Sequence, residues 1–283
     1  MRAVYECRCV AKTAAALLQG VPGTIFADGW LVKYSVPMES VDFLALRDAE
    51  VASRMTTGTG ILSGWDITRR YTRAEWAAAS HALVSRFRTF EPAGEECGTV
   101  YDDTGACPEC AAGGVQVSPL RLPASRLPRG VDIAITIGGE IVVSKRFREC
   151  AERTELTGAS FGPVEAPRAP HRTNEGWFQL RVTSQHLEVA EVTTFGRDPF
   201  DTTTYGRCPR GDLAGLNLLS ELFLKAPPTP AADFAETRQR VGLANGVGLL
   251  RARRLLVLSA RARTVLLAAG MRSLQLEIAH VVP

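Results

Sequence analysis

Several landmarks of residues 107–164 recur in the same order in the second half of the chain. Those of the first half are Cys107-Pro108, Asp132 and Ser144, and those of the second are Cys208-Pro209, Asp233 and Ser259. The first two offsets agree, since 208 minus 107 and 233 minus 132 both give 101, while 259 minus 144 gives 115, longer by one loop. Chance alignment of common residues is the alternative. We interpret the conserved order as a degenerate internal duplication.

The duplication predicts an α+β protein of two related halves, with mixed sheets and flanking helices. With 283 residues the chain is long enough for two domains that each bury a core. We place the halves at 1–168 and 169–283, with the proline-containing segment 165–175 as the link. A composition of 46% hydrophobic and 22% charged residues is typical of globular proteins, and a net charge of +3 is too small to indicate a nucleic-acid partner.

The sequence predicts a cytoplasmic protein that does not contact a membrane. Charged residues interrupt the first nine positions where a signal peptide needs an apolar region, and no run of about 18 uncharged apolar residues occurs. Seven cysteines in a chain of this length favour reduced thiols and one metal site over a disulfide framework. Cys7 and Cys9 alternate on one face of a predicted strand, and we expect buried thiols there.

Residues 30–36 are predicted to form a strand and residues 39–54 a helix. Thr72 and Glu75 have capping-box spacing and precede an alanine-rich stretch, which predicts a helix over 72–88. The prolines of Pro119–Gly130 predict an extended surface connector.

In the first half, alternating isoleucines after Asp132 predict a strand, Ser144 a helix N-cap, 145–154 a helix and 159–164 a returning strand. In the second half we expect a helix over 231–241 and a turn at Asn245-Gly246. Residues 255–278 repeat the pattern of strand, serine-capped helix and strand.

The cysteines before the first repeated unit have the spacing of a degenerate zinc ribbon. A ribbon uses two tight turns, each of which presents two thiolates to one tetrahedral ion. Cys107-Pro108-Glu109-Cys110 is a whole turn, whereas Cys97-Gly98 is half of one, because Gly94 stands where its first cysteine would be. We therefore predict zinc on Cys97, Cys107 and Cys110. The candidates for the fourth ligand are Asp102, Asp103, Cys208 or water, and a turn that has lost its metal is the alternative.

We interpret Cys208-Pro209-Arg210-Gly211 as a degenerate repeat of the Cys107–Cys110 turn, with Gly211 in place of the second cysteine. Cys208 could be a lone buried thiol, or it could supply a fourth thiolate if the halves pack face to face. Nothing else in the sequence specifies such packing, which favours the lone thiol. No histidine or poised acid accompanies the cysteines, so the sequence predicts neither catalytic residues nor an enzyme.

Arginines crowd the last repeated unit, at Arg251, Arg253, Arg254, Arg261 and Arg263. A solvated face is one interpretation. A zinc-ribbon protein that binds nucleic acid through these arginines is the alternative function, and we expect its affinity to fall steeply with salt. A metalloenzyme with an open zinc position is a third hypothesis.

Several motifs resemble the double-CXXCG-motif proteins of myxobacteria. They are the Cys97-Gly98 half-turn, Cys107-Pro108-Glu109-Cys110, and the Val143–Phe147 strand-to-helix junction with Leu156-Thr157-Gly158 after it. That family includes immunity proteins, which protect a cell from the toxin of its kin. The resemblance covers about half the chain, and only Cys97, Cys107 and Cys110 match the family's cysteine pattern; Gly94 and Ala111 depart from it. It implies a non-catalytic cytoplasmic antitoxin that binds a cognate protein toxin.

Overall fold

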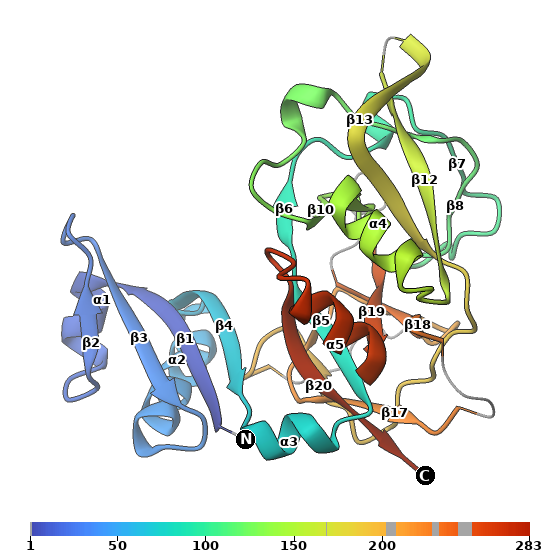
Figure 1. The fold of residues 1–283 in the computed structure, drawn as a ribbon. Coiled ribbons are helices and arrows are strands. Elements are labelled where there is room, and N and C mark those ends of the chain that lie inside the picture. The colour runs from blue at the N-terminus through green and yellow to red at the C-terminus, as the bar shows by residue number, and fades with distance from the viewer. Residues whose placement is uncertain (1, 168, 202–207, 228–231, 243–250) are drawn as a thin grey trace. The chain divides into compact units, whose positions relative to one another are not determined.

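The computed structural model describes residues 2–167, 169–201, 208–227, 232–242 and 251–283. The chain forms two compact units (Figure 1). Unit 1 comprises Met1–Ala78 with Asp198–Thr202, and unit 2 comprises Ala79–Arg197 with Thr203–Pro283. The described chain is a mixture of helices and strands in which strands dominate, so the predicted α+β class is confirmed. No helix within the described ranges has the length and apolar character needed to cross a membrane.

Unit 1 is a four-stranded antiparallel sheet in the order β2-β3-β1-β4. Its elements are β1 (Arg2–Val10), α1 (Ala11–Leu17), β2 (Gly23–Ile25), β3 (Leu31–Pro37), α2 (Val41–Thr57), β4 (Leu62–Arg70) and α3 (Arg73–Ala78). Tyr5, Phe43 and Phe200 pack their rings together in its core, with centroids 5.2 to 5.5 Å apart. Cys7 and Cys9 are buried in the same core, as predicted. The predicted strand over 30–36 and helix over 39–54 correspond to β3 and α2.

The helix predicted over 72–88 is wrong beyond its first turns. The capping box forms, since the Glu75 amide donates to Thr72 Oγ1 at 3.2 Å and the Thr72 amide donates to Glu75 Oε2 at 2.6 Å. However, α3 ends at Ala78 and the chain continues as strand β5 (His81–Arg86), which lies between two strands of a sheet in unit 2. The backbone and side-chain contacts of that central position outweigh the helix propensity of the alanines.

The first sheet of unit 2 has six strands in the order β6-β10-β11-β13-β12-β9. Its strands are β6 (Arg88–Phe90), β9 (Leu120–Arg121), β10 (Ile133–Thr136), β11 (Ile141–Ser144), β12 (Ala159–Ala166) and β13 (Ala169–Val182), and helix α4 (Lys145–Arg153) follows β11. The four inner strands are antiparallel to one another, whereas β6 and β9 run parallel to their neighbours at the edges. The strand, capped helix and strand predicted for the first half are therefore confirmed.

The second sheet of unit 2 has the order β15-β18-β19-β5-β20-β17. Its later strands are β15 (Leu213–Ala214), β17 (Leu222–Lys225), β18 (Phe234–Gly242), β19 (Arg253–Ser259) and β20 (Gln275–Val282), and helix α5 (Ala260–Ala268) follows β19. Position by position, every pairing has the same direction as in the first sheet. The repeated pattern over 255–278 is confirmed as β19, α5 and β20.

Short elements complete unit 2. They are η1 (Glu95–Cys97), the two-stranded sheet of β7 (Tyr101–Asp102) and β8 (Val115–Gln116), η2 (Ala124–Arg126), and the two-stranded sheet of β14 (Phe195–Gly196) and β16 (Asn217–Leu218). The predicted connector 119–130 thus contains β9 and η2. The helix predicted over 231–241 is wrong, because residues 234–241 belong to strand β18, which pairs with β19. The turn predicted at Asn245-Gly246 lies outside the described residues.

The two sheets of unit 2 exchange one strand each. β5 precedes all strands of the first sheet in the chain but pairs with β19 and β20 in the second. β13 precedes all the strands of the second sheet other than β5, but it pairs with β11 and β12 in the first. β12 and β13 also run through most of the predicted link 165–175. The predicted boundary at 168/169 falls between these two strands and stays a prediction.

Helices α4 and α5 begin with the same set of hydrogen bonds. Ser144 and Ser259 are the N-caps, and each hydroxyl accepts from the amide three residues later, at 3.1 and 3.0 Å. Each hydroxyl also donates to a buried aspartate at 2.7 Å, Ser144 to Asp132 and Ser259 to Asp233. The two predicted N-caps are confirmed.

An arginine near the start of each helix reaches the end of the other helix. Arg146 and Arg261 donate through Nη1 to these same aspartates, at 3.1 and 2.8 Å. Through Nη2, Arg146 donates to the carbonyl of Ala269, the C-cap of α5, and Arg261 to the carbonyl of Thr154, the C-cap of α4. A cation is unfavourable at the start of its own helix, but here it lies at the negative end of the neighbouring helix.

The loop after each helix also donates a backbone hydrogen bond to the aspartate at the start of the other helix. The Arg272 amide, after α5, donates to Asp132 at 2.9 Å, and the Thr157 amide, after α4, donates to Asp233 at 3.0 Å. Phe147 and Phe234 pack below these groups with ring centroids 6.2 Å apart, in a hydrophobic cluster to which both sheets contribute. The two sheets therefore share one core in unit 2.

Candidate metal centre

Residues Cys107-Pro108-Glu109-Cys110 form a tight turn in unit 2. The Cys107 amide donates to the Ala112 carbonyl, and the Ala111 amide donates to the Cys107 carbonyl, both at 2.8 Å. Ala111 closes the turn with φ of 54°, in the left-handed region that favours glycine. The backbone conformation at this position therefore favours glycine, although this chain has alanine there.

Cys208 begins a second turn that is one residue shorter. The Cys208 amide donates to the Asp212 carbonyl at 3.3 Å, and the Gly211 amide donates to the Cys208 carbonyl at 2.8 Å. Gly211 has φ of 83° and closes the turn. It therefore occupies the position of Ala111, and the interpretation of Gly211 as a replaced cysteine is corrected. The residue missing from the second turn is the counterpart of Cys110.

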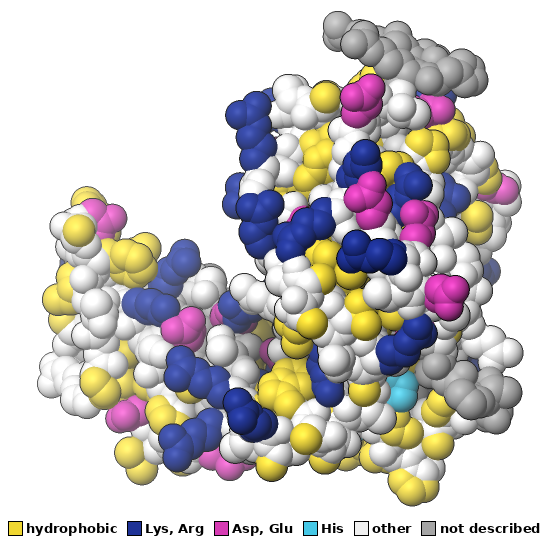
Figure 2. All heavy atoms as spheres, in the orientation of Figure 1, with side chains coloured by type: hydrophobic (Ala, Val, Ile, Leu, Met, Phe, Trp, Pro, Cys, Tyr) yellow, Lys and Arg dark blue, Asp and Glu magenta, His cyan; other side chains and the backbone are white. Residues whose placement is uncertain are grey.

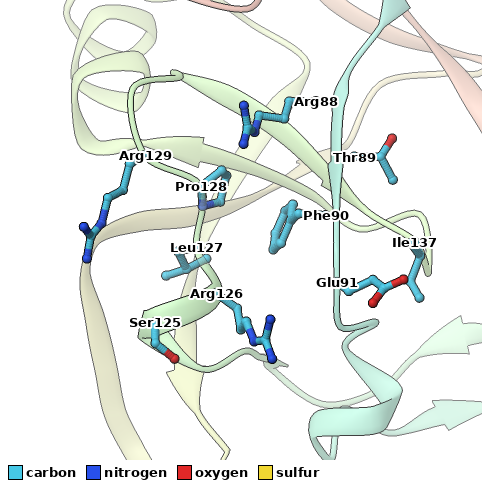
Figure 3. Close-up of a pocket in the computed structure, with 10 residues that line it drawn as sticks. All are labelled: Arg88, Thr89, Phe90, Glu91, Ser125, Arg126, Leu127, Pro128, Arg129 and Ile137. Carbon is cyan, nitrogen blue, oxygen red and sulfur yellow. The ribbon is translucent and has the colours of Figure 1, made fainter. Parts of the chain in front are cut away.

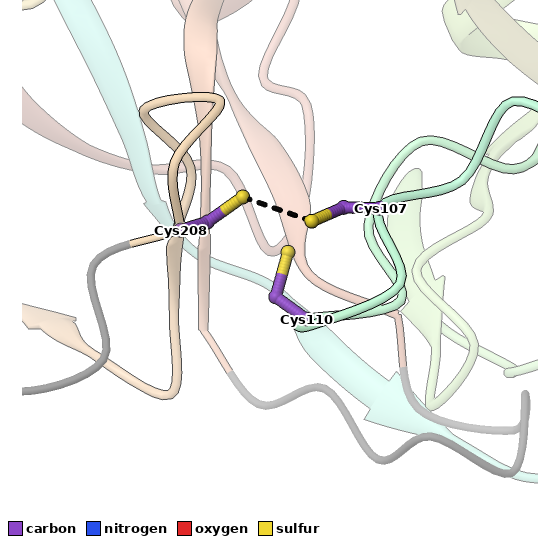
Figure 4. A group of neighbouring side chains, drawn as sticks. All are labelled: Cys107, Cys110 and Cys208. Carbon is purple, nitrogen blue, oxygen red and sulfur yellow. Dashed lines mark hydrogen bonds between the residues drawn. The ribbon is translucent and has the colours of Figure 1, made fainter.

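Three thiols from the two turns converge. The Sγ atoms of Cys107 and Cys208 are 3.2 Å apart, and those of Cys107, Cys110 and Cys208 all lie within 4.8 Å of one another. Figure 4 shows the three side chains pointing toward one another, with Cys208 approaching from the opposite side. Cys107 and Cys208 are buried, and Cys110 is half-buried. Such a group could hold a metal ion.

Backbone amides of the two turns point at the sulfur atoms. Cys107 Sγ accepts hydrogen bonds from the amides of Glu109 and Cys110, and Cys110 Sγ accepts one from the amide of Ala112. In the second turn the Arg210 amide donates to Cys208 Sγ at 3.3 Å. Amide donors stabilise the negative charge of a thiolate, which is the form that binds metal.

The thiols of the first turn differ in acidity. The hydrogen bond with Cys208, assisted by the two backbone amides, lowers the pKa of Cys107 to about 7. Burial, together with the neighbouring thiols of Cys208 and Cys107, raises the pKa of Cys110 to about 12. Deprotonation is therefore easier at Cys107 than at Cys110, whose thiolate form a bound cation would stabilise.

Cys97, predicted as the third ligand, is not a member of this group. It ends η1 and packs beside the hydrophobic cluster of Leu120. A Cβ atom at Gly94 would come within 2.6 Å of Leu120 Cδ1 and 2.7 Å of Glu140 Oε1. A cysteine at Gly94 would therefore require the buried side chains of Leu120 and Glu140 to shift. The third thiol of the group comes from Cys208 instead.

The carboxylates considered as fourth ligands are engaged elsewhere. Asp102 accepts a hydrogen bond from the Thr104 amide at 2.9 Å, and Asp103 forms an ion pair with Arg251 at 2.7 Å. Among the described residues, no histidine, aspartate or glutamate joins the three thiols.

Comparison with known protein families finds no family model that matches this chain, and comparison with curated proteins finds no similar sequence. The resemblance to the double-CXXCG-motif proteins accordingly stays a prediction, which rests on the cysteine turn and the strand-to-helix junctions alone.

The arginines of the last repeated unit are mostly engaged within the protein. Arg251 contacts Glu95 and Asp103 and lies 4.2 Å from the ring of Tyr101. Arg253 lies 5.0 Å from the ring of Phe87, and burial lowers its pKa to about 10. The others donate to backbone carbonyls: Arg254 to Thr237 and Arg238, Arg261 to Thr154 and Glu155, and Arg263 to Ala79. Arg251, Arg253, Arg261 and Arg263 therefore do not form a free basic face.

A basic hollow of about 670 Å³ lies elsewhere in unit 2, between β6 and the loop that carries η2 (Figure 3). Arg88, Arg126 and Arg129 surround the ring of Phe90, and Glu91 is its single acidic residue. On the face drawn in Figure 2, Lys and Arg side chains gather along this edge of unit 2. Neither the thiols nor the predicted site residues line the hollow.

Proposed function

We propose that Cys107, Cys110 and Cys208 bind a structural zinc ion. The observation that carries the proposal is the approach of three thiols from turns 101 residues apart, all within 4.8 Å. Zinc–sulfur bonds of about 2.3 Å in a tetrahedral site put two sulfur atoms about 3.8 Å apart. The distance of 3.2 Å between Cys107 and Cys208 and the upper limit of 4.8 Å bracket this value. A disulfide bond is far shorter, at about 2.05 Å.

We infer a structural ion because the surroundings of the thiols are those of a packed turn. Backbone amides surround the sulfur atoms, and no described acid or base joins the group. When bound, zinc would hold the two turns together and so stabilise the fold.

The proposal includes the internal duplication and the degenerate zinc ribbon. Its support is the strand-for-strand agreement of the two sheets and the matched hydrogen bonds of Asp132 and Asp233. The ribbon then consists of one turn from each half, in place of two turns from the first half. Zinc lies between the copies and is shared by them.

For the whole chain we propose a cytoplasmic, non-catalytic protein-binding function, that of an immunity protein that inhibits a cognate bacterial toxin. The resemblance supports this, and the internal contacts of the arginines from Arg251 to Arg263 weaken the nucleic-acid alternative. Co-expression with a toxin encoded in a neighbouring reading frame tests it. We expect restored growth and co-purification of the two proteins; continued toxicity with no complex contradicts the proposal.

Metal analysis of protein purified without chelators tests the zinc site. We expect one zinc ion per chain, its loss in Cys208→Ser, and its retention in Cys97→Ser, the matched control. Equal zinc in wild type and Cys208→Ser contradicts the proposed ligand set, as does retention in Cys208→Ser together with loss in Cys97→Ser.

A further inference from the structure

A hollow of about 350 Å³ lies in unit 2 beside the two cysteine turns. Gly105 and Ala112 of the first turn region, Arg210 of the second, and residues of β18 and β19 form its walls. We propose that this hollow is a binding site for a small ligand that carries phosphate groups. The proposal does not depend on the metal or on the antitoxin function.

Positive charge dominates the hollow. Arg210, Arg238, Arg240 and Arg254 line it, and Asp212 is the single carboxylate among the lining residues. Asp212 is committed to Arg240, whose amide donates to Oδ1 at 3.0 Å and whose Nη1 lies 3.5 Å from Oδ2. The guanidinium groups of Arg210, Arg238 and Arg254 thus form no ion pair in the hollow, and Arg254 interacts with Asp212 and Glu236 only through longer-range electrostatics.

These three groups contact neutral partners or none. Arg210 Nη1 donates to the Gly105 carbonyl at 2.6 Å, and Arg254 Nη1 donates to the Thr237 carbonyl at 2.9 Å. The exposed Arg238 side chain forms no hydrogen bond or ion pair with any residue that the structure describes. A backbone carbonyl that accepts a hydrogen bond positions the guanidinium group but does not neutralise its charge.

The unbalanced charge extends to neighbouring groups. Burial lowers the pKa of His186, and the charges of Arg254 and Arg240 lower it further. Burial likewise lowers the pKa of Arg254, with Arg240 contributing. Burial raises the pKa of Glu236, an acid within electrostatic reach of both arginines, while the charges of Arg254, Arg240 and Arg253 oppose that rise. The field at the hollow therefore favours an anion.

The geometry favours phosphate over a single carboxylate. Guanidinium groups form paired hydrogen bonds with phosphate oxygens, and the excess of arginines over carboxylates in the lining matches a ligand with several negative charges. A volume of about 350 Å³ lies at the small end of ligand pockets, which suits a diphosphate or a nucleotide rather than an extended chain.

Calorimetric titration with pyrophosphate, at constant ionic strength set with sodium chloride, tests the proposal. We expect saturable binding that Arg238→Ala weakens about tenfold or more, because one charge-assisted contact is lost. The affinity of Arg238→Lys for pyrophosphate should fall between those of wild type and Arg238→Ala, since lysine keeps the charge but loses the planar pair of donors. Arg153→Ala is the matched control: Arg153 is exposed on α4, and its removal changes the net charge equally. We expect it to change affinity less than about twofold.

Circular dichroism and an independent Arg210→Ala variant separate loss of binding from loss of fold. Pyrophosphate that binds no better than chloride, or that binds Arg238→Ala and Arg210→Ala as well as wild type, overturns the proposal. Tighter binding of hexaglutamate or of a single-stranded oligonucleotide than of pyrophosphate, with loss in the same variants, also overturns it, because it reassigns the hollow to a macromolecular partner. Stronger binding of a nucleoside diphosphate than of pyrophosphate supports it and identifies the nucleotide as the source of the phosphate.

Discussion

The two halves of unit 2 agree at the helix starts and differ at the cysteine turns. Asp132 and Asp233 accept from serine, arginine and a loop amide in the same way. By contrast, the turn of Cys107 contains two cysteines, and the turn of Cys208 is one residue shorter with a single cysteine. The helix starts contact each other reciprocally, so a substitution at one helix start alters the contacts of both. The turns supply thiols to a single group. That group needs enough thiols in total, and it does not matter which turn provides each of them.

The largest expected effect is at the turns. On the proposed zinc site, Cys208→Ser removes a ligand from the shorter turn and Cys110→Ser removes one from the longer. Both variants should lose most of the metal-derived stability, which is on the order of 10 kcal/mol for structural zinc sites. Denaturant unfolding with and without added zinc measures the loss. A variant that unfolds like wild type in both conditions contradicts a structural ion.

The helix starts should give a smaller effect that is equal in the two copies. Asp132→Ala and Asp233→Ala each leave a serine hydroxyl, a guanidinium and an amide without their acceptor, at a cost of about 2–4 kcal/mol. Urea unfolding of the two variants provides the comparison. Costs that differ by more than about 1.5 kcal/mol would show that the two networks are not energetically equivalent.

Acid should weaken both helix starts together. Burial alone would raise the pKa of Asp132, but donors from Arg272 and Ser144 and the charge of Arg146 outweigh it, and the pKa is lowered. The pKa of Asp233 is lowered by corresponding donors against the same opposing effect of burial. A folded-state pKa below the unfolded value of about 3.9 means that the stabilisation is present above that pH and is lost as pH falls through the folded value.

Thermal unfolding from pH 6 to pH 2 tests this, with Asp132→Asn and Asp233→Asn as controls. The difference between wild type and each variant should be constant above about pH 5 and shrink below it. A difference that grows as pH falls would reverse the sign of the proposed linkage.

The smallest effect concerns the residue that closes each turn. Ala111 has φ of 54°, whereas its counterpart Gly211 has φ of 83°. Ala111→Gly removes a left-handed alanine and should stabilise the fold by about 1 kcal/mol. Gly211→Ala should destabilise it by a similar amount. Melting temperatures of the two variants, measured side by side, decide whether the turns share one backbone geometry; a loss of stability in Ala111→Gly contradicts it.

Sequence reasoning succeeded where a local pattern fixes local structure. The caps at Ser144 and Ser259 and the elements around them follow from the residues within one turn of each. It failed at 81–86 and 234–241, where helices were predicted, because these residues form strands with partners distant in the chain. The site divides in the same way: Cys107 and Cys110 belong to one turn, whereas the approach of Cys208 depends on how the sheets pack. The shared offset of 101 was the available signal for Cys208.

The exchange of β5 and β13 has a consequence for how such a chain can arise. If the halves descend from one sequence, a single copy could not complete its own sheet, because its first strand belongs to the sheet of the other copy. The ancestral chain would have been a domain-swapped homodimer, with one metal ion on its two-fold axis and equivalent thiols on both sides. Fusion into one polypeptide would have made the partner permanent. Each copy would then have been free to lose a ligand that symmetry had previously duplicated.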